Sequence, residues 1–115
     1  MKISGLHGRK VVDRVRRHGN RWKGRHMSMT YVANRNEELL VGTSASKKLH
    51  KSAVKRNKMR RRCREALRVT VKEQQVNELT SKQVNVSLLI TPRSSSLTCD
   101  FIELRDDAEA FLNHL

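Results

Sequence analysis

The sequence predicts an α/β fold, one α+β domain over residues 1–115 that is built as a two-layer sandwich of helices on a sheet. Chain length is the first reason, because 115 residues can bury one hydrophobic core and not two. The second is that apolar residues recur in some segments at the spacing of helices and in others at the alternation of strands. The third is uneven charge, since residues 1–72 hold 22 Lys and Arg whereas residues 73–115 hold 3. A folded domain with one basic side has this pattern.

The first elements expected along the chain are a helix and two strands. Valines at helical spacing predict a helix from Gly8 to His18, which Gly19 ends. Alternating apolar and polar side chains predict a strand from Met27 to Ala33, and a second strand is expected from Leu39 to Ala45. Residues 34–37 are typical of a turn, so we expect the two strands to pair as an antiparallel hairpin.

A long helix is expected from Ser52 to about Lys72. At about 100° per residue, one stripe of this helix is apolar and should face the core. The stripe consists of Met59, Cys63, Ala66, Leu67 and Thr70. Basic residues cover most of the remaining surface, so the helix is expected to be both a core element and a basic ridge.

The C-terminal part is expected to add a loop, a strand and a closing helix. Residues 73–82 are polar and are interpreted as a loop, residues 84–90 form the most apolar strand, and Pro92 ends it. Thr98 is the expected N-cap of the closing helix. That helix should pack through Phe101, Leu104, Ala108, Phe111, Leu112 and Leu115 and carry Asp106, Asp107 and Glu109 on its outer face. The predicted order is α-β-β-α-β-α.

Several functional classes receive no support. No apolar run approaches the roughly 20 residues of a membrane span, and the N-terminus lacks a signal-peptide pattern, so we expect a cytoplasmic protein. Cys63 and Cys99 are interpreted as reduced thiols, and no Cys or His spacing suits a metal, so no metal site is predicted. The basic half has only four acidic residues and no phosphate-binding glycine loop, which predicts no catalytic residue and no small-molecule substrate.

The basic run predicts the partner. Between Lys47 and Arg64, 10 of 18 residues are Lys or Arg, and no acidic residue occurs before Glu65. Solvated helices usually mix charges of both signs, whereas a phosphate backbone requires this density of cations. A DNA-reading helix-turn-helix would need a second helix before the ridge, and strands are predicted there instead. We therefore expect RNA.

The same segment carries a resemblance to a known family. Residues 44–65 read SASKKLHKSAVKRNKMRRRCRE, which resembles the motif of the protein subunit of bacterial ribonuclease P. That motif is a strand ending in S-x-K-K, a short basic turn, and then R-N-R/K-x-K/R-R-x-x-R-E on a helix. The first helix ending in His18-Gly19 and the strand ending in Pro92-Arg93 also fall in the order of that family.

The resemblance implies a left-handed crossover around the long helix and a division of labour. A catalytic RNA subunit with magnesium would cleave precursor tRNA, and the protein would bind both RNAs without a cofactor of its own. The residues that match the motif, and would contact RNA, are Lys47, Lys48, Lys51, Arg56, Asn57, Arg60, Arg61 and Arg64. A cleft between the first helix and the sheet would hold the single-stranded 5' leader; its expected residues are Val12, Val15, Met29, Tyr31 and Arg93.

The chain departs from the family pattern in that cleft. Val12 and Val15 stand where the family usually has phenylalanines, so leader binding should be more electrostatic. The turn at residues 49–52 is also one residue longer than in common versions.

Two other functions remain open at the level of sequence. A small ribosomal protein would share the charge and size, and co-sedimentation with ribosomal subunits would favour it. A basic membrane-surface binder is the weaker alternative, because the basic helix lacks a large aromatic and leucine face.

Overall fold

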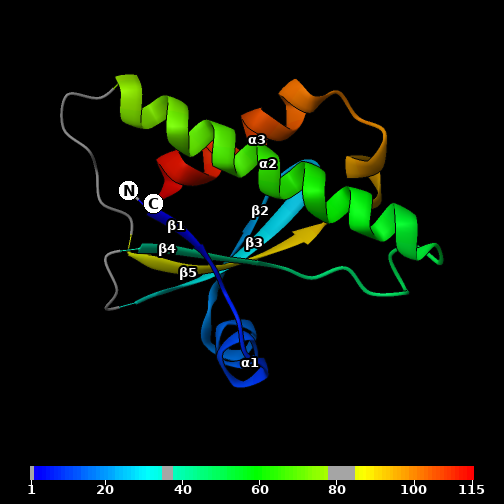
Figure 1. The fold of residues 1–115 in the computed structure, drawn as a ribbon, viewed down its shortest axis with the longest axis horizontal. Helices are drawn as coiled ribbons and strands as arrows, with labels where there is room; N and C mark the ends of the chain where they lie inside the picture. The colour runs from blue at the N-terminus through cyan, green and yellow to red at the C-terminus, as the bar shows by residue number, and fades with distance from the viewer. Residues whose placement is uncertain (1, 35–37, 78–84) are drawn as a thin grey trace.

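The computed structural model describes residues 2–34, 38–77 and 85–115. Its elements in order are β1 (Lys2–Gly5), α1 (Arg9–His18), β2 (Asn20–Lys23), β3 (Met27–Ala33), β4 (Glu38–Thr43), α2 (Ala53–Asn77), β5 (Val86–Pro92), the 3-10 helix η1 (Ser94–Leu97) and α3 (Phe101–His114). A five-stranded sheet lies in the middle, with α2 and α3 on one face and α1 on the other (Figure 1). The predicted α/β sandwich is confirmed, and α1 adds cover to the second face of its sheet.

The strand order is β1-β4-β5-β3-β2. Strands β1, β4 and β5 are parallel, and β3 is antiparallel to β5. The predicted hairpin between β3 and β4 is therefore wrong, because β5 lies between them. The two strands do run in opposite directions, but β5 is buried from Ser87 to Ile90, and its apolar residues Leu88, Leu89 and Ile90 take the centre of the sheet.

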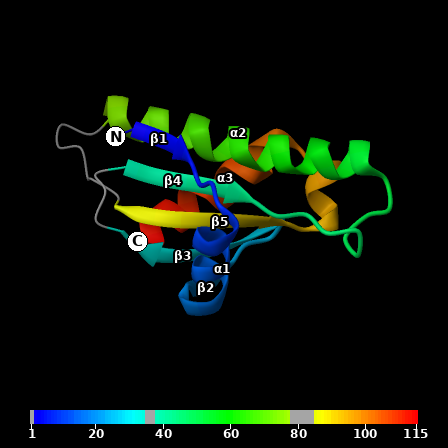
Figure 2. The same cartoon turned by 60° about the horizontal axis from the view of Figure 1, so that its bottom comes forward.

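The connection from β4 to β5 is left-handed. Seen from the side of α1, both strands run from left to right, β5 lies below β4, and α2 returns behind the sheet (Figure 2). About 98% of such connections are right-handed, so this crossover is a rare feature. It places the N-terminal end of α2 beyond the C-terminal end of β4. The crossover that the family resemblance implied is confirmed.

Two short edge strands were missed by the sequence analysis. β1 and β2 have four residues each and pair at opposite edges of the sheet, β1 with β4 and β2 with β3. Their sequences, KISG and NRWK, carry lysine or arginine and little apolar periodicity. Short, charged strands are typical of sheet edges, and pairing with a neighbour defines them more than their own pattern does.

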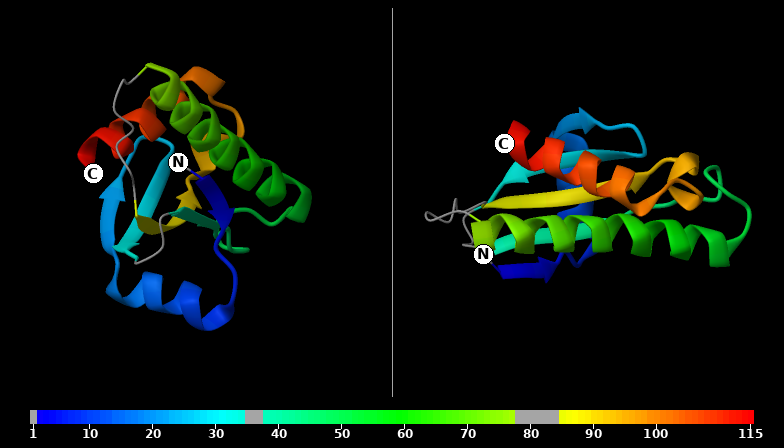
Figure 3. Two further views of the ribbon diagram at one scale, coloured as in Figure 1. Left: turned by 60° about the vertical axis from the view of Figure 1, so that its left-hand side comes forward. Right: turned by 90° about the horizontal axis from the view of Figure 1, so that it is seen from above.

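The main core lies between the sheet and the helices α2 and α3, which run side by side over it (Figure 3). The predicted stripe of α2 is confirmed, since all five residues are buried, and Val71 extends it. The helix continues to Asn77, so residues 73–77 are helical and the loop prediction is wrong there. Residues 78–82 of that predicted loop, and Val84, lie outside the described residues.

Helix α3 packs largely as predicted. Leu104, Ala108, Phe111 and Leu112 are buried, and Leu115 packs against them, but Phe101 is 37% exposed because it occupies the first turn.

The predicted cap and one predicted surface residue are wrong. Asp100, not Thr98, caps α3, because η1 is inserted ahead of the helix and Thr98 ends η1. Asp107 is buried, whereas Asp106 and Glu109 are exposed as predicted. The Asp107 carboxylate accepts hydrogen bonds from the backbone N–H groups of Arg25 (3.1 Å) and His26 (2.7 Å), which compensates its burial.

Among the residues that the structure describes, none of the helices combines the length and apolar character that a membrane crossing requires. Both cysteines are free thiols, as predicted. Cys63 is fully buried, and burial raises the pKa of its thiol to about 12, so it is protonated and inert at neutral pH.

Candidate RNA-binding surface

The predicted RNA-contacting residues lie together at the junction of β4 and α2. Residues 44–52 leave the end of β4 and enter α2, whose first turn is capped by Ser52: its Oγ accepts a hydrogen bond from the backbone N–H of Lys55 (3.3 Å). The N–H of Ser52 in turn donates to Nδ1 of His50 (3.0 Å). These bonds fix the direction in which the basic turn meets the helix.

Two arginines of the motif, both on α2, hold the turn of residues 44–52 through hydrogen bonds to its backbone carbonyl groups. Arg56 donates from Nη1 to the carbonyl oxygens of His50 (2.8 Å) and Lys51 (3.0 Å). Arg60 donates from Nη2 to the carbonyl oxygen of Ala45 (2.8 Å) and from Nη1 to Oδ1 of Asn57 (2.7 Å). Both side chains are thus engaged by the protein itself, and sequence reasoning, which assigned them to RNA contact, missed this positioning role.

The remaining predicted residues project into solvent. Lys47, Lys48, Lys51, Asn57, Arg61 and Arg64 are all exposed. Lys55 and Lys58, which were not among the predicted contacts, are exposed on the same part of α2. The structure therefore presents exposed lysine and arginine side chains on a backbone that internal hydrogen bonds hold in place.

The other basic residues of α2 have protein partners. Arg62 donates to the carbonyl oxygens of Ser96 and Cys99, both at 2.5 Å, and so ties α2 to the segment before α3. Arg68 pairs with Glu65, with Nε to Oε2 at 3.0 Å, and this hydrogen bond lowers the pKa of the Glu65 carboxyl. The one acid of the ridge is thereby matched by Arg68 and leaves Arg61 and Arg64 uncompensated.

A groove of about 490 Å³ opens on the other face of the sheet, beside α1. Its lining residues are Val11, Arg14, Val15, Val32, Ala33, Asn34 and Ser87. A small core of Leu6, Val15 and Leu89 seats α1 on the sheet. Arg16 of α1 donates from Nη2 to Oγ of Ser44 (3.2 Å), so α1 is connected to the start of the basic turn.

The five residues predicted for a leader cleft do not come together. Val12 and Val15 face the sheet from α1, but Met29 and Tyr31 point to the opposite face. The Tyr31 ring packs edge-on against Phe111 of α3, with centroids 5.4 Å apart. Arg93 is exposed beyond the C-terminal end of β5, whereas the groove lies near its N-terminal end.

Strand alternation is the physical reason for this correction. Successive side chains of β3 point to opposite faces, so Thr30 and Val32 face α1 while Met29 and Tyr31 face α3. The sequence offered the signal, because Val32 is out of phase with the apolar series of Met27, Met29 and Tyr31. On α1, the exposed apolar residue of the groove is Val11, which is 44% exposed.

The fold and the exposed cations together define a small, basic α/β protein of the class that binds RNA. The chain belongs to the ribonuclease P protein family, because the family model described as Ribonuclease P matches residues 2–115.

Individual proteins of that family resemble the chain along most of its length. It is 26% identical over 114 residues to the ribonuclease P protein component of Rickettsia canadensis (strain McKiel), covering 93% of this chain and 92% of that protein. Its fold is similar to that of the RNase P protein from Thermotoga maritima, with a TM-score of 0.75, 18% identity and 96% of each chain covered. The RNase P protein of Staphylococcus aureus matches with a TM-score of 0.69 at 17% identity, covering 96% of this chain and 93% of that one.

Proposed function

We propose that, within ribonuclease P, this protein is the subunit that binds the catalytic RNA and precursor tRNA, and that the RNA performs the cleavage that removes the 5' leader. Membership of the family makes ribonuclease P the activity in which the chain takes part. The observation that carries the proposal is the junction of β4 and α2, where exposed cations stand on a turn that Arg56 and Arg60 hold in place. An ordered turn loses less conformational entropy when it binds phosphates.

The chemistry of cleavage is assigned to the RNA. General acid–base catalysis by the protein would need a carboxylate or an oriented histidine beside the bound substrate. Near the basic surface, the carboxylates of Asp13 and Glu65 pair with Arg16 and Arg68. We propose that magnesium ions serve the RNA-based reaction and that no residue at the junction of β4 and α2 holds them.

The groove beside α1 is proposed to receive the 5' leader. Val11 and Val32 supply apolar contacts there, and Arg14 supplies a cation for phosphate. This assignment moves the leader site from the predicted set to the residues that line the groove. It also agrees with the expectation of a mainly electrostatic grip, because no aromatic residue is among the groove's lining residues. We place this activity in the cytoplasm.

A small ribosomal protein, the alternative that the sequence left open, is not favoured. The matching family model and the similar solved structures are ribonuclease P proteins.

Reconstitution tests the proposal. The protein is combined with its cognate catalytic RNA and a precursor tRNA at low magnesium concentration, and the 5' product is measured. We expect the protein to raise the cleavage rate of the RNA and to cleave nothing by itself. Metal-dependent cleavage by the protein without RNA, or no effect on the rate and no binding to the RNA, would overturn the proposal.

A further inference from the structure

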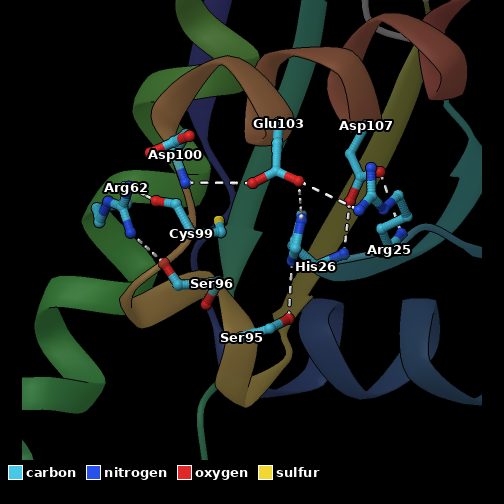
Figure 4. A network of polar contacts seen from close by, with 9 residues as sticks. All are labelled: Arg25, His26, Arg62, Ser95, Ser96, Cys99, Asp100, Glu103 and Asp107. Atoms are coloured by element: carbon cyan, nitrogen blue, oxygen red, sulfur yellow. Dashed lines mark hydrogen bonds and ion pairs between the residues drawn. The ribbon is translucent and has the colours of Figure 1, made fainter.

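Three side chains of types that bind metals meet beside η1 and the start of α3, although they come from distant parts of the sequence. His26 lies between β2 and β3, Cys99 lies between η1 and α3, and Glu103 lies in the first turn of α3. One ligand atom from each residue lies within 4.8 Å of the others. Figure 4 shows the three side chains facing one another.

The His26 ring is held as metal-binding histidines are held. The residue is only 8% exposed, and its Nε2 is buried without a hydrogen-bond partner. The Glu103 carboxylate approaches Nε2 to 3.6 Å, which is beyond hydrogen-bond distance. The other ring nitrogen, Nδ1, is 2.8 Å from Oγ of Ser95. When Nδ1 donates to Ser95, the lone pair of Nε2 points at the cluster.

Each of the three residues is also positioned from outside the cluster. The backbone N–H of His26 donates to Asp107 at 2.7 Å, and the carbonyl oxygen of Cys99 accepts a hydrogen bond from Arg62. The backbone N–H of Asp100 donates to Oε2 of Glu103 at 3.3 Å, which leaves Oε1 facing His26. A buried polar nitrogen without a partner inside such a supported cluster calls for an explanation.

We propose that Nε2 of His26, Sγ of Cys99 and a carboxylate oxygen of Glu103 form a zinc-binding site. An imidazole nitrogen, a thiolate sulfur and a carboxylate oxygen suit Zn²⁺, whereas Mg²⁺ and Ca²⁺ prefer oxygen ligands only. The thiolate and the carboxylate balance the two charges of the ion. Zinc takes four ligands, and solvent can supply the fourth because the Glu103 side chain is 29% exposed.

Arg25 is the group that the ion would displace. Its Nη2 lies 3.2 Å from Oε1 of Glu103, and its side chain is 75% exposed, so it can turn into solvent. The bound ion would join the corner between β2 and β3 to the start of α3. Through the bonds of Arg62 to Ser96 and Cys99 it would also stabilise the position of α2. The role assigned to the ion is therefore structural, and it reverses the sequence-based prediction that the protein binds no metal.

The test uses the whole protein with Zn²⁺ and with Co²⁺ as a spectroscopic probe. Titration of metal-free protein with Co²⁺ should give a sulfur-to-cobalt charge-transfer band in the near ultraviolet that saturates at one equivalent. Stoichiometric Zn²⁺ should remove this band and raise the melting temperature by at least about 5 °C, because the ion binds only the folded chain.

Matched variants identify the ligands. Cys99→Ser should abolish the band, whereas Cys63→Ala, which removes the other thiol, should keep it. His26→Gln should weaken Zn²⁺ binding at least about 10-fold, whereas His18→Gln, at an exposed histidine, should not change it. Glu103→Gln, at a partly exposed position, is the third ligand variant and should also weaken Zn²⁺ binding. Circular dichroism confirms that each variant is folded.

Two kinds of result would overturn the proposal. Wild-type protein without a charge-transfer band, or with a melting temperature that Zn²⁺ leaves unchanged, has no such site. A band that persists in Cys99→Ser or disappears in Cys63→Ala assigns the sulfur to a different residue and also excludes the site.

Discussion

The guanidinium of Arg60 donates a hydrogen bond of 2.8 Å to the carbonyl oxygen of Ala45, across fifteen residues of sequence. This bond joins the first turns of α2 to the chain that leaves β4, and with the bond from Arg60 to Asn57 it fixes the base of the basic turn. The motif therefore contains cations of two kinds: those that build the surface and those that face solvent.

Arg60→Ala should affect folding and RNA binding together. Loss of its hydrogen bonds should lower the free energy of unfolding by about 1 kcal/mol, because the side chain is half-buried, and the loosened turn should bind RNA less tightly. Chemical denaturation and an RNA-binding titration measure the two effects. Arg61→Ala is the matched control, since Arg61 is exposed; it should weaken RNA binding and leave stability within about 0.5 kcal/mol. Equal stability of the two variants would contradict the positioning role.

Arg64→Ala should act on RNA binding alone. A charge-assisted contact to phosphate is worth roughly 1–3 kcal/mol, and its loss should lower the slope of log K against log salt by about one. Lys72→Ala, an exposed cation near the other end of α2, should change neither quantity. Titrations at several salt concentrations measure both. A salt slope that Arg64→Ala does not reduce would mean that Arg64 is not in contact with RNA phosphate.

Asp107→Ala should destabilise the fold by about 1–3 kcal/mol, because it leaves the backbone N–H groups of Arg25 and His26 without their acceptor. Asp106→Ala changes the exposed neighbouring residue and should stay within about 0.5 kcal/mol of the wild type. Thermal or urea unfolding compares the two variants. If both variants have the stability of the wild type, the buried carboxylate contributes nothing to the corner between β2 and β3.

The parts of the fold that were predictable from sequence are those that local periodicity determines. Met59, Cys63 and Leu67 recur at helical spacing, and the structure buries all three. Strand β3 begins at Met27 and ends at Ala33 as predicted, because apolar and polar side chains alternate from Met27 to Tyr31. In each case one segment contains the whole signal, so no knowledge of its neighbours is needed.

Relations between distant segments were not predictable in this way. Nothing within residues 27–45 indicates that β5 will lie between β3 and β4, since that depends on a strand forty residues further along the chain. The burial of Asp107 likewise depends on two backbone N–H groups more than eighty residues away. The residues predicted for the leader cleft do not come together for a different and local reason: the residue types were considered without the face of β3 on which each one lies.

Val11→Phe tests the groove beside α1, where the chain lacks the aromatic residues that the family usually offers. Val11 is 44% exposed and lines the groove, whereas Val12 packs partly into the small core under α1, so a ring at position 11 can reach a bound leader without displacing the core. Stacking on one base is worth about 1–3 kcal/mol by alanine substitution, so the preference for precursor over mature tRNA should rise by a factor of about 5 or more.

Salt dependence distinguishes the stacking contribution of Val11→Phe from the electrostatic contacts that are proposed for the wild type. In the wild type the preference for precursor tRNA should fall steeply as salt increases, because cations such as Arg14, which lines the groove, are proposed to hold the leader through its phosphates. In Val11→Phe the added part of the preference should persist at high salt, because stacking does not depend on counterion release. Ile102→Phe is the matched control: Ile102 is 61% exposed on α3, on the other side of the sheet, and a ring there should leave the preference unchanged. If the wild-type preference is insensitive to salt and Val11→Phe behaves like Ile102→Phe, the leader binds elsewhere on the protein.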